Sequence, residues 1–443
     1  MRHIYFFIAL LVLYGDLLKR NFTASISLVM IYGVAVLLLF AIVVQKRKAR
    51  YHVSAEGKVV FKLTVFLMLL YILQLLTSFS SSFADGLSHT LYICIPLLYI
   101  AVIYKYCPQF DLLALGKAFL FLMIPVNMVG TVQYFVDPTF MISTAYGDEL
   151  GGVILRNFLG ERSFFSRYPS LFASADRYSA MGLMQFFFTL IILKGGRSFS
   201  RKDKSWLTFN LISAGGALFI AGARSRILIA GVALTLMALA FMFSIMFSVK
   251  GGKVGRILKR YLPLLVGAVV VAFIVFGNWS TKQDERLLSF PVLNLLAQSV
   301  DEGDIGVRVE EATSLSRMLE DATFFGQGLG SIANGKPGEF GIRSMWIESG
   351  YIWGGMMVLT YLSIIVALTL LLWRSFMSFD ALSVAIYCIP VLWLVFAVLA
   401  GLTSAFELST GVLLGCAIAV ISRTPRNITG GYIMPLPIQR NLH

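Results

Sequence analysis

The sequence predicts an all-α, polytopic membrane protein with about twelve transmembrane helices. Three observations carry this fold class. Hydrophobic residues make up 58% of the 443 residues and only 14% are charged, whereas a soluble domain carries about 25% charged residues. The apolar residues gather in long runs, separated by charged or Gly/Ser-rich breaks. Clusters of Lys and Arg recur in alternate breaks, as expected for a chain that crosses a membrane repeatedly.

The predicted spans are apolar runs that approach the roughly 20 residues a helix needs to cross a bilayer. The first run is short, but no small-residue cleavage site follows it and Lys19 and Arg20 come directly after, so we expect a span and not a removed signal peptide. In chain order, the twelve predicted spans are residues 4–18, 22–45, 59–79, 91–106, 112–135, 178–193, 206–222, 227–249, 261–276, 345–373, 381–402 and 406–421.

Basic clusters set the predicted orientation, because Lys and Arg in short loops favour the cytoplasmic side. Such clusters follow the second, sixth and eighth predicted spans, at residues 46–50, 194–204 and 250–260. All three lie on one side if twelve spans leave both termini in the cytoplasm. The formal net charge of +14 is then mostly a topology signal and a source of contact with anionic membrane lipids. It does not indicate nucleic-acid binding.

The same topology places two long segments outside the membrane. A first loop occupies residues 136–177, and a large, partly helical loop occupies residues 277–344 between the ninth and tenth predicted spans. We treat residues 1–443 as a single transmembrane domain that carries these two loops. All four cysteines lie in or beside predicted spans, so neither loop has the pair needed for an internal disulfide. We expect packing against the helices to hold the loops.

Two arginines, Arg224 and Arg226, break the charge pattern because they lie in the short outer turn between the seventh and eighth predicted spans. One interpretation is that they reach outward to lipid headgroups. The other is anion binding. Two guanidiniums one residue apart, at a helix junction loosened by Gly222, suit a phosphate or a diphosphate. The sequence alone leaves both interpretations open.

The first outer loop also combines arginines with aromatic residues. Arg167 and Arg177 lie among phenylalanines and tyrosines, and Asp176 directly precedes Arg177. Aromatic faces beside Arg and Asp commonly hold sugar rings next to phosphates. An amphipathic loop that rests on headgroups would have the same composition, so both interpretations stay open here too.

The large loop contains a predicted helix followed by a glycine-rich run. Apolar residues recur at helical spacing over residues 306–322, so Arg308 lies at the head of this helix and acidic residues occupy its polar sides, as in a solvated face. The run FFGQGLGS then follows at residues 324–331. Alternating glycines leave a bare backbone that a ligand can approach closely. Gly326 and Gly328 are therefore candidate substrate-binding residues.

The order of these motifs resembles the O-antigen polymerase and O-antigen ligase superfamily (Wzy and WaaL). The resemblance rests on an Arg-headed helix, here at Arg308, a glycine segment, here FFGQGLG, and an entry into the next span, here ESGYIWGG from Glu348. The turn GARSR, which ends at Arg226, resembles the family's Ser-Arg turn. The segment RYPSLF, which begins at Arg167, resembles a motif that precedes a span. The resemblance covers about residues 60–422.

The resemblance implies a glycosyltransferase without metal or other cofactor, at the periplasmic face of the bacterial plasma (inner) membrane. Its substrate would be a polyprenyl-diphosphate-linked oligosaccharide. Arg224, Arg226 and Arg308 would hold the donor diphosphate while a sugar hydroxyl of a second lipid-linked unit attacks the anomeric carbon. The sequence contains no Asp-x-Asp pair and no histidine cluster with metal-ligand spacing.

Asp176 and Glu348 are the candidate general bases, by placement only. Many family members carry a histidine shortly before the Glu-x-Gly entry, whereas this chain has Arg343 there, a candidate substrate-binding residue, and no histidine. Of its four histidines, only His89 lies near the predicted outer face. A mechanism that uses a histidine of the loop therefore does not carry over.

We therefore expect a polymerase that joins repeat units into surface polysaccharide, such as O-antigen, capsule or exopolysaccharide, alongside a chain-length regulator and a flippase. Two alternatives stay open: an O-antigen ligase that transfers glycan to an acceptor, and a flippase or transporter of lipid-linked oligosaccharide. Transporters usually have two similar halves and charged or broken helices near the midplane. The sequence shows no matching halves, and its polar residues concentrate in the two outer loops, which favours chemistry at the outer face.

Overall fold

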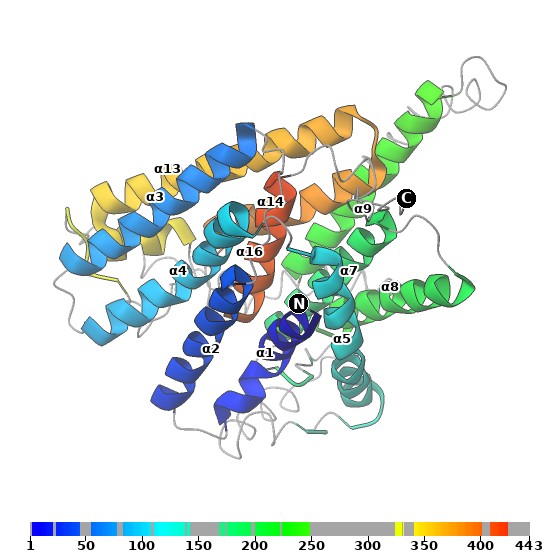
Figure 1. Cartoon of the computed structure of the whole chain (residues 1–443), viewed down its shortest axis with the longest axis horizontal. Helices are drawn as coiled ribbons and strands as arrows, with labels where there is room; N and C mark the ends of the chain where they lie inside the picture. Colours follow the sequence, from blue (N-terminus) through cyan, green and yellow to red (C-terminus); the bar gives the residue numbers. More distant parts are fainter. Residues whose placement is uncertain are drawn as a thin grey trace, which may run out of the picture.

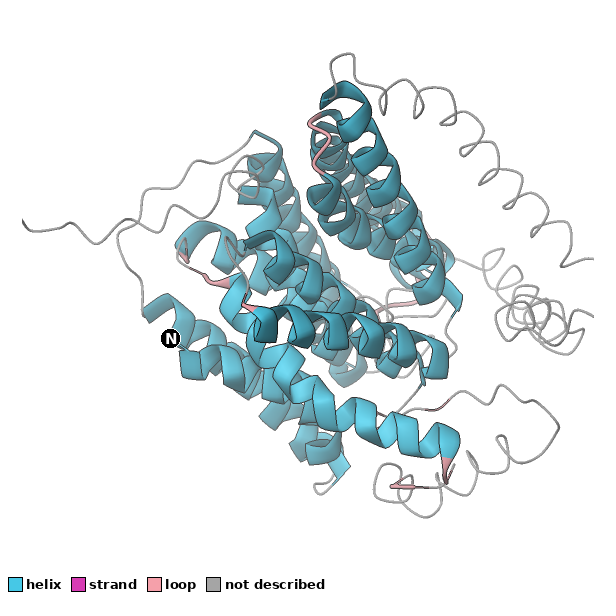
Figure 2. Cartoon of the chain, turned by 90° about the vertical axis from the view of Figure 1, so that its right-hand side faces the viewer, coloured by secondary structure: helices cyan, strands magenta, loops and turns pink. Residues whose placement is uncertain are grey.

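The computed structural model of the chain describes residues 2–20, 24–44, 55–77, 83–107, 110–137, 140–141, 168, 170–172, 175–195, 200–221, 224–248, 324–329, 331, 341–400 and 408–423. Every regular element within these residues is an α-helix, and none is a strand (Figure 2). The predicted all-α class is confirmed for this part of the chain.

Eleven helices occur in the described residues: α1 (Arg2–Arg20), α2 (Ala24–Val44), α3 (Ala55–Thr77), α4 (Phe83–Tyr106), α5 (Leu112–Phe135), α7 (Ala175–Gly195), α8 (Arg201–Ala221), α9 (Arg224–Ser248), α13 (Gly341–Met377), α14 (Ala381–Ala400) and α16 (Leu408–Arg423). Seven of them contain a segment long and apolar enough to cross a membrane, and three shorter apolar helices accompany these. The molecule is therefore a helical membrane protein. The ninth predicted span, residues 261–276, lies outside the described residues, so the count of twelve stays a prediction.

The α13–α14 hairpin joins two groups of helices (Figure 1). On one side α13 lies along α3, and α3 packs against α4. On the other side α14 packs against α9 and α7. Only residues 378–380 connect α13 to α14, so the two helices are antiparallel neighbours. The second half of α14 therefore points back toward the start of α13.

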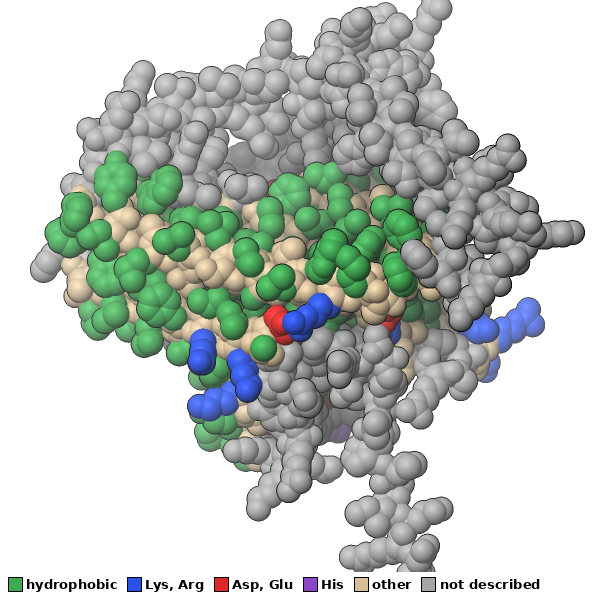
Figure 3. Space-filling view, turned by 90° about the horizontal axis from the view of Figure 1, so that it is seen from above, with side chains coloured by type: hydrophobic (Ala, Val, Ile, Leu, Met, Phe, Trp, Pro, Cys, Tyr) green, Lys and Arg blue, Asp and Glu red, His purple; other side chains and the backbone are tan. Residues whose placement is uncertain are grey.

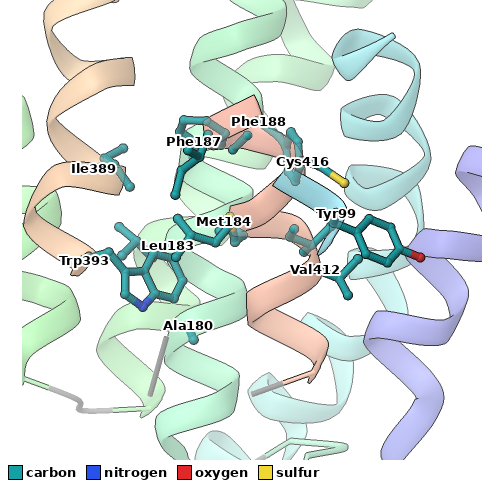
Figure 4. Close-up of a cluster of buried hydrophobic side chains, with 14 of the residues drawn as sticks. Tyr99, Ala180, Leu183, Met184, Phe187, Phe188, Ile389, Trp393, Val412 and Cys416 are labelled. Carbon is teal, nitrogen blue, oxygen red and sulfur yellow. The ribbon is translucent and has the colours of Figure 1, made fainter. Parts of the chain in front are cut away.

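Helix α7 lies at the centre of the bundle. Every side chain from Tyr178 to Ile192 is buried, as expected for a helix that is apolar on all sides. Figure 4 shows Leu183 and Met184 of this helix among Trp393 of α14 and Val412 of α16. Because α7 is mostly apolar and its few polar side chains in this stretch are buried as well, the helix has neighbours around its whole circumference.

Exposed hydrophobic side chains cover the outside of the helices. Figure 3 shows one face of the molecule, on which hydrophobic side chains far outnumber charged ones among the described residues. Proteins in water rarely expose apolar areas of more than a few hundred Å², whereas a membrane helix presents such side chains to lipid. Examples on α3 and α13 are Phe66, Leu69, Leu76, Leu359, Val366 and Leu370.

Ion pairs connect the helices at the end of the bundle where α13 meets α14. Lys194 of α7 contacts both Asp380 and Ser383 at the start of α14. Arg374 Nη2, near the end of α13, lies 2.5 Å from Glu56 Oε1 at the start of α3. The predicted orientation assigns this end to the cytoplasm. The predicted glycosyl transfer would take place at the opposite end.

The described end of the first outer loop packs onto the helices. Ser170 donates its backbone N–H to Gln133 Oε1 at 2.8 Å and its hydroxyl to the carbonyl of Val126 at 2.5 Å, both on α5. Phe172 is buried, and its ring stacks on that of Tyr178 with 6.2 Å between centroids. All four cysteines of the chain are free and buried. Packing, and no disulfide, therefore holds this end of the loop, as expected.

Candidate functional site

The start of α13 folds back on itself at Gly350. This glycine has φ +70° and ψ 177°, a conformation that L-residues rarely adopt. A Cβ placed on Gly354 would lie 2.9 Å from the carbonyl oxygen of Met345, although a straight helix would separate the two positions by about 13 Å. The predicted span at residues 345–373 is therefore bent near its start, and the segment before Gly350 lies alongside the segment after it.

The glycine-rich run packs its backbone against this bend. Gln327 donates its backbone N–H to the carbonyl of Ile347 at 2.8 Å, and Gly328 donates to the carbonyl of Glu348 at 2.9 Å. Gly326 and Gly328 have φ +83° and +99°, and a Cβ on Gly326 would collide with the carbonyl of Glu348. We call this contact, between residues 326–328 and 347–350, the glycine latch. What approaches the bare backbone here is the chain itself, and substrate binding by Gly326 and Gly328 stays a prediction.

The latch places a buried carboxylate beside a histidine. His89 Nδ1 on α4 lies 3.5 Å from Glu348 Oε2, and the two side chains are 3% and 2% exposed. Gln74 Nε2, near the end of α3, donates to the carbonyl of Glu348 at 3.2 Å. Three helices thus converge on one residue of the predicted Glu-x-Gly entry. Ionisable groups are costly to bury among apolar helices and usually mark a functional site.

A tyrosine lies beside this pair, and a second tyrosine contacts the first. The ring centroid of Tyr71 lies 6.1 Å from that of His89, and the hydroxyl of Tyr71 lies 3.4 Å from that of Tyr361. Both tyrosines are buried. By contrast, Phe324 and Phe325, which directly precede the latch, are 59% and 66% exposed. The buried pair therefore lies close to an exposed aromatic turn.

A second buried charge comes from the turn between α8 and α9. Arg226 is 4% exposed, and its guanidinium carbon lies 4.8 Å from the ring centroid of Trp393 on α14, a cation–π contact. Asp176, at the start of α7, attracts this guanidinium electrostatically. An arginine that reached outward to headgroups would be exposed. The guanidinium of Arg226 therefore does not reach outward to headgroups, and anion binding by this residue stays a prediction.

Both groups lie toward the same end of the bundle, opposite the α13–α14 turn. Arg226 and His89 are each near the first residues of their helices. At 1.5 Å per residue, Gly354 lies about 37 Å along α13 from Phe379 in that turn. Trp393 lies about 21 Å along α14 from the same residue. The His89 pair therefore lies further from the turn than Arg226 does.

The remaining predicted site residues are only partly described. Asp176 is exposed and Arg177 is half-buried at the start of α7, a helix that packs against α9. The predicted helix at residues 306–322 lies outside the described residues. Arg308 and Arg167 also lie outside the described residues. The side chains of Arg224 and Arg343 do so as well.

Sequence reasoning singled out Glu348, Arg226 and Asp176 as candidates, but not the other partners that the structure gives the first two. His89 carries a slight signal, because it is a lone histidine near the outer end of an apolar span. Trp393 carries none, since a tryptophan in an apolar helix is ordinary packing. Gln74 is a polar residue near a predicted span end, where polar residues are common.

Within the part of the chain that the structure describes, no group of three or more His, Cys, Asp or Glu side chains is placed to hold a metal ion. No protein-family model matches the sequence, and no curated protein matches it. The described site thus consists of a buried imidazole and carboxylate, a buried guanidinium on a tryptophan, and an exposed aromatic turn. These are groups that move protons, bind anions and stack on rings.

Proposed function

We propose that the protein polymerises polyprenyl-diphosphate-linked oligosaccharide units into a surface polysaccharide, by metal-independent glycosyl transfer at the periplasmic face of the bacterial plasma membrane. The observation that carries this proposal is the buried guanidinium of Arg226 on Trp393. Arg226 lies near the start of α9, an apolar helix, at the end of the bundle that the predicted orientation assigns to the periplasm. Arg226 also stands in the turn that resembles the family's Ser-Arg motif.

The order of the groups along the helices matches the order of the parts of such a substrate. The polyprenyl chain lies in lipid, the diphosphate follows, and the sugars extend outward. Trp393, which Arg226 contacts, lies closer to the α13–α14 turn along α14 than the bend that holds Glu348 does along α13. In this arrangement Arg226 holds the diphosphate, and the sugars extend toward the glycine latch.

Arginines suit the step that such a reaction needs. As the bond between the anomeric carbon and the diphosphate breaks, negative charge grows on the leaving group, and Arg226 stabilises it together with Arg224 and Arg308. A charge-assisted hydrogen bond contributes about 1.5–3 kcal/mol. Further contacts to the sugars and the diphosphate come from residues of the outer loops: Asp176, Arg177, Arg167 and Arg343.

The test is to delete the gene in its host, restore it with variants, and resolve the surface glycans on gels. Arg226→Ala should remove the long glycan ladder while single repeat units stay attached, with normal protein abundance in the membrane. Arg226→Lys should fail too, because an ammonium lacks the planar fork that fits a phosphate. Arg374→Ala is the matched control, since Arg374 is an exposed arginine at the opposite end, and it should leave the ladder intact.

Two outcomes would contradict the proposal at different levels. A normal ladder with Arg226→Ala at normal abundance would remove Arg226 from the donor site. An unchanged glycan profile in the deletion strain would exclude polysaccharide polymerisation altogether.

One observation favours a second candidate, an O-antigen ligase that transfers glycan to a different acceptor. The sequence lacks the family's loop histidine, but the fold brings His89 of α4 to Glu348. The same gel separates the candidates, because loss of a ligase removes single repeat units as well as the ladder. Polyprenyl-linked polymer would accumulate in that case, whereas loss of a flippase would leave only single units on the lipid.

A further inference from the structure

We propose that His89 is the catalytic base of the transfer, that Glu348 positions its imidazole, and that the acceptor sugar reaches this pair over Phe324 and Phe325. The inference rests on the proposed function and names the groups that handle the acceptor. It concerns residues of α4, α13 and the glycine latch, none of which belongs to the Arg226 site.

The pair is held with the rigidity that a positioning residue needs. The carbonyl of Glu348 accepts hydrogen bonds from Gln74 Nε2 at 3.2 Å and from the Gly328 N–H at 2.9 Å. A third bond joins Gln327 to Ile347, the residue before it. The backbone that carries the carboxylate is thus fixed from two sides. Catalytic groups must be held within about 0.5 Å of their working geometry, and this backbone provides such support.

A role in packing alone explains the pair poorly. Burying an imidazole and a carboxylate removes both from water, and their attraction rarely repays that cost. Elsewhere in this bundle, neutral side chains pair buried helices, as when Asn127 Nδ2 donates to Gln185 Oε1 at 2.9 Å. A pair that titrates is needed where a proton is transferred.

The exposed turn beside the pair suits an acceptor sugar. The rings of Phe324 and Phe325 pack edge to face with 5.3 Å between centroids, and both are mostly exposed. A Cβ on Gly350 would collide with the carbonyl of Phe324, so this turn touches the bend that carries Glu348. Tyr351, the next residue, is exposed as well. Aromatic rings stack on the apolar faces of sugars, while the hydroxyls find polar groups nearby.

The acceptor hydroxyl oxygen forms a bond to the anomeric carbon of the donor, and a lone pair on the His89 imidazole takes the hydroxyl proton. The bond from the anomeric carbon to the diphosphate oxygen breaks, and its electron pair leaves with the polyprenyl diphosphate. The Glu348 carboxylate stabilises the imidazolium that forms, and the proton then passes to water or to the released diphosphate.

The experiment uses the full-length chain in lipid nanodiscs, with a synthetic polyprenyl-diphosphate oligosaccharide as donor and acceptor. His89→Ala should slow polymer formation by about 10²- to 10⁴-fold, the range for a general base, while donor binding stays unchanged. Free imidazole should restore part of the rate, because it can enter the space that the side chain leaves. His89→Gln keeps a polar side chain and should be equally slow. His3→Ala, a change at an exposed histidine of α1, is the control and should have the wild-type rate.

Each other outcome overturns the proposal. A rate near wild type for either His89 variant removes the base. A slow, stably folded His89→Ala that imidazole does not restore assigns the pair to packing, and so does unfolding of both variants. Polymer made by the wild-type chain and by His89→Ala alike refutes only this inference, whereas no polymer from the wild-type chain refutes the proposed function as well.

Two further sets of variants test the other parts. Glu348→Asp keeps the carboxylate and should retain more activity than Glu348→Gln, a difference that a filler of space would not produce. Phe324→Ala combined with Phe325→Ala should raise KM for the acceptor and leave kcat nearly unchanged, because the rings bind and do not react. A fall in kcat alone would exclude the proposed route over the aromatic turn.

Discussion

Two buried polar regions of this helix bundle differ in their chemistry. Between α5, α7 and α8, Asn127 Nδ2 donates to Gln185 Oε1 at 2.9 Å, and Gln185 Nε2 donates to Asn210 Oδ1 at 3.0 Å. The hydroxyl of Tyr178 donates to Asn127 Oδ1 at 3.1 Å. We call these four residues the amide ladder. Between α3, α4 and α13, the corresponding buried groups are the imidazole and carboxylate of His89 and Glu348.

The amide ladder is suited to packing, whereas the pair of His89 and Glu348 is suited to chemistry. An amide both donates and accepts, so the ladder satisfies itself without a net charge and specifies how three apolar helices pack. An imidazole exchanges its proton near neutral pH, and a carboxylate beside it is expensive among apolar helices. The ladder is therefore expected to contribute stability, and the pair to contribute to transfer.

The largest effect on polymer formation is expected from neutralising Glu348. Glu348→Gln keeps the volume but removes the charge that orients His89, so polymer formation should fall by about 10²- to 10⁴-fold. The melting temperature should change little, because the amide fills the same volume and can still form a hydrogen bond with the imidazole. The nanodisc assay and thermal unfolding measure the two effects. Glu56→Gln, at the opposite end of the bundle, should keep the wild-type rate, and equal losses in both variants would refute the distinction.

The second largest effect is expected from the glycine latch. Backbone hydrogen bonds fix the segment that carries Glu348, whereas side-chain hydrogen bonds connect the residues of the ladder. Gly350→Ala places a Cβ against the backbone of Phe324 and Gly326, and the positive φ alone costs about 1–3 kcal/mol. Both stability and polymer formation should fall. Gly355→Ala is the control, because no atom lies within 4 Å of the Cβ that it adds. Equal melting temperatures for the two variants would show that the latch does not hold the bend.

Removing an amide from the ladder should lower stability and leave activity unchanged, the opposite of what is expected for neutralising Glu348. Gln185→Leu removes the amide between Asn127 and Asn210, and the loss of such bonds inside a membrane protein costs about 1–2 kcal/mol. The melting temperature should fall, while polymer formed per folded molecule should not. Thr189→Val on the same helix is the control, since Thr189 donates only to the carbonyl of Gln185 within α7. A loss of turnover in folded Gln185→Leu would give the ladder a catalytic role.

The smallest effect is expected from a charge that lies in neither region. At the start of α8, the Ser200 N–H and hydroxyl donate to Asp203 Oδ2 at 3.0 and 2.7 Å, and these bonds lower the pKa of the Asp203 carboxyl. A lowered pKa means that the contribution to stability is present at neutral pH and is lost as the pH falls through the folded-state pKa. Asp203→Asn should barely change the melting temperature at neutral pH and not at all in strong acid. A change as large as that of Gln185→Leu would contradict this ranking.

The class of the molecule follows from its amino-acid sequence alone. A bilayer offers no water to unpaired backbone groups, so long apolar runs in such a chain form helices. The sequence also singled out Arg226, Glu348 and the glycine run, because charges and alternating glycines stand out beside apolar spans. The roles of Arg308, Arg167 and Arg343 stay predictions from the sequence.

Which residues contact one another depends on the fold and does not follow from the sequence. Gln74 and Glu348 are 274 positions apart in the chain, and apolar runs such as α14 carry no polar face that would show which neighbour each side contacts. The structure likewise places the glycine run against the chain's own bend at Gly350, and His89 of α4 beside Glu348. Local sequence specifies the helices, whereas contacts between them depend on how their side chains pack together.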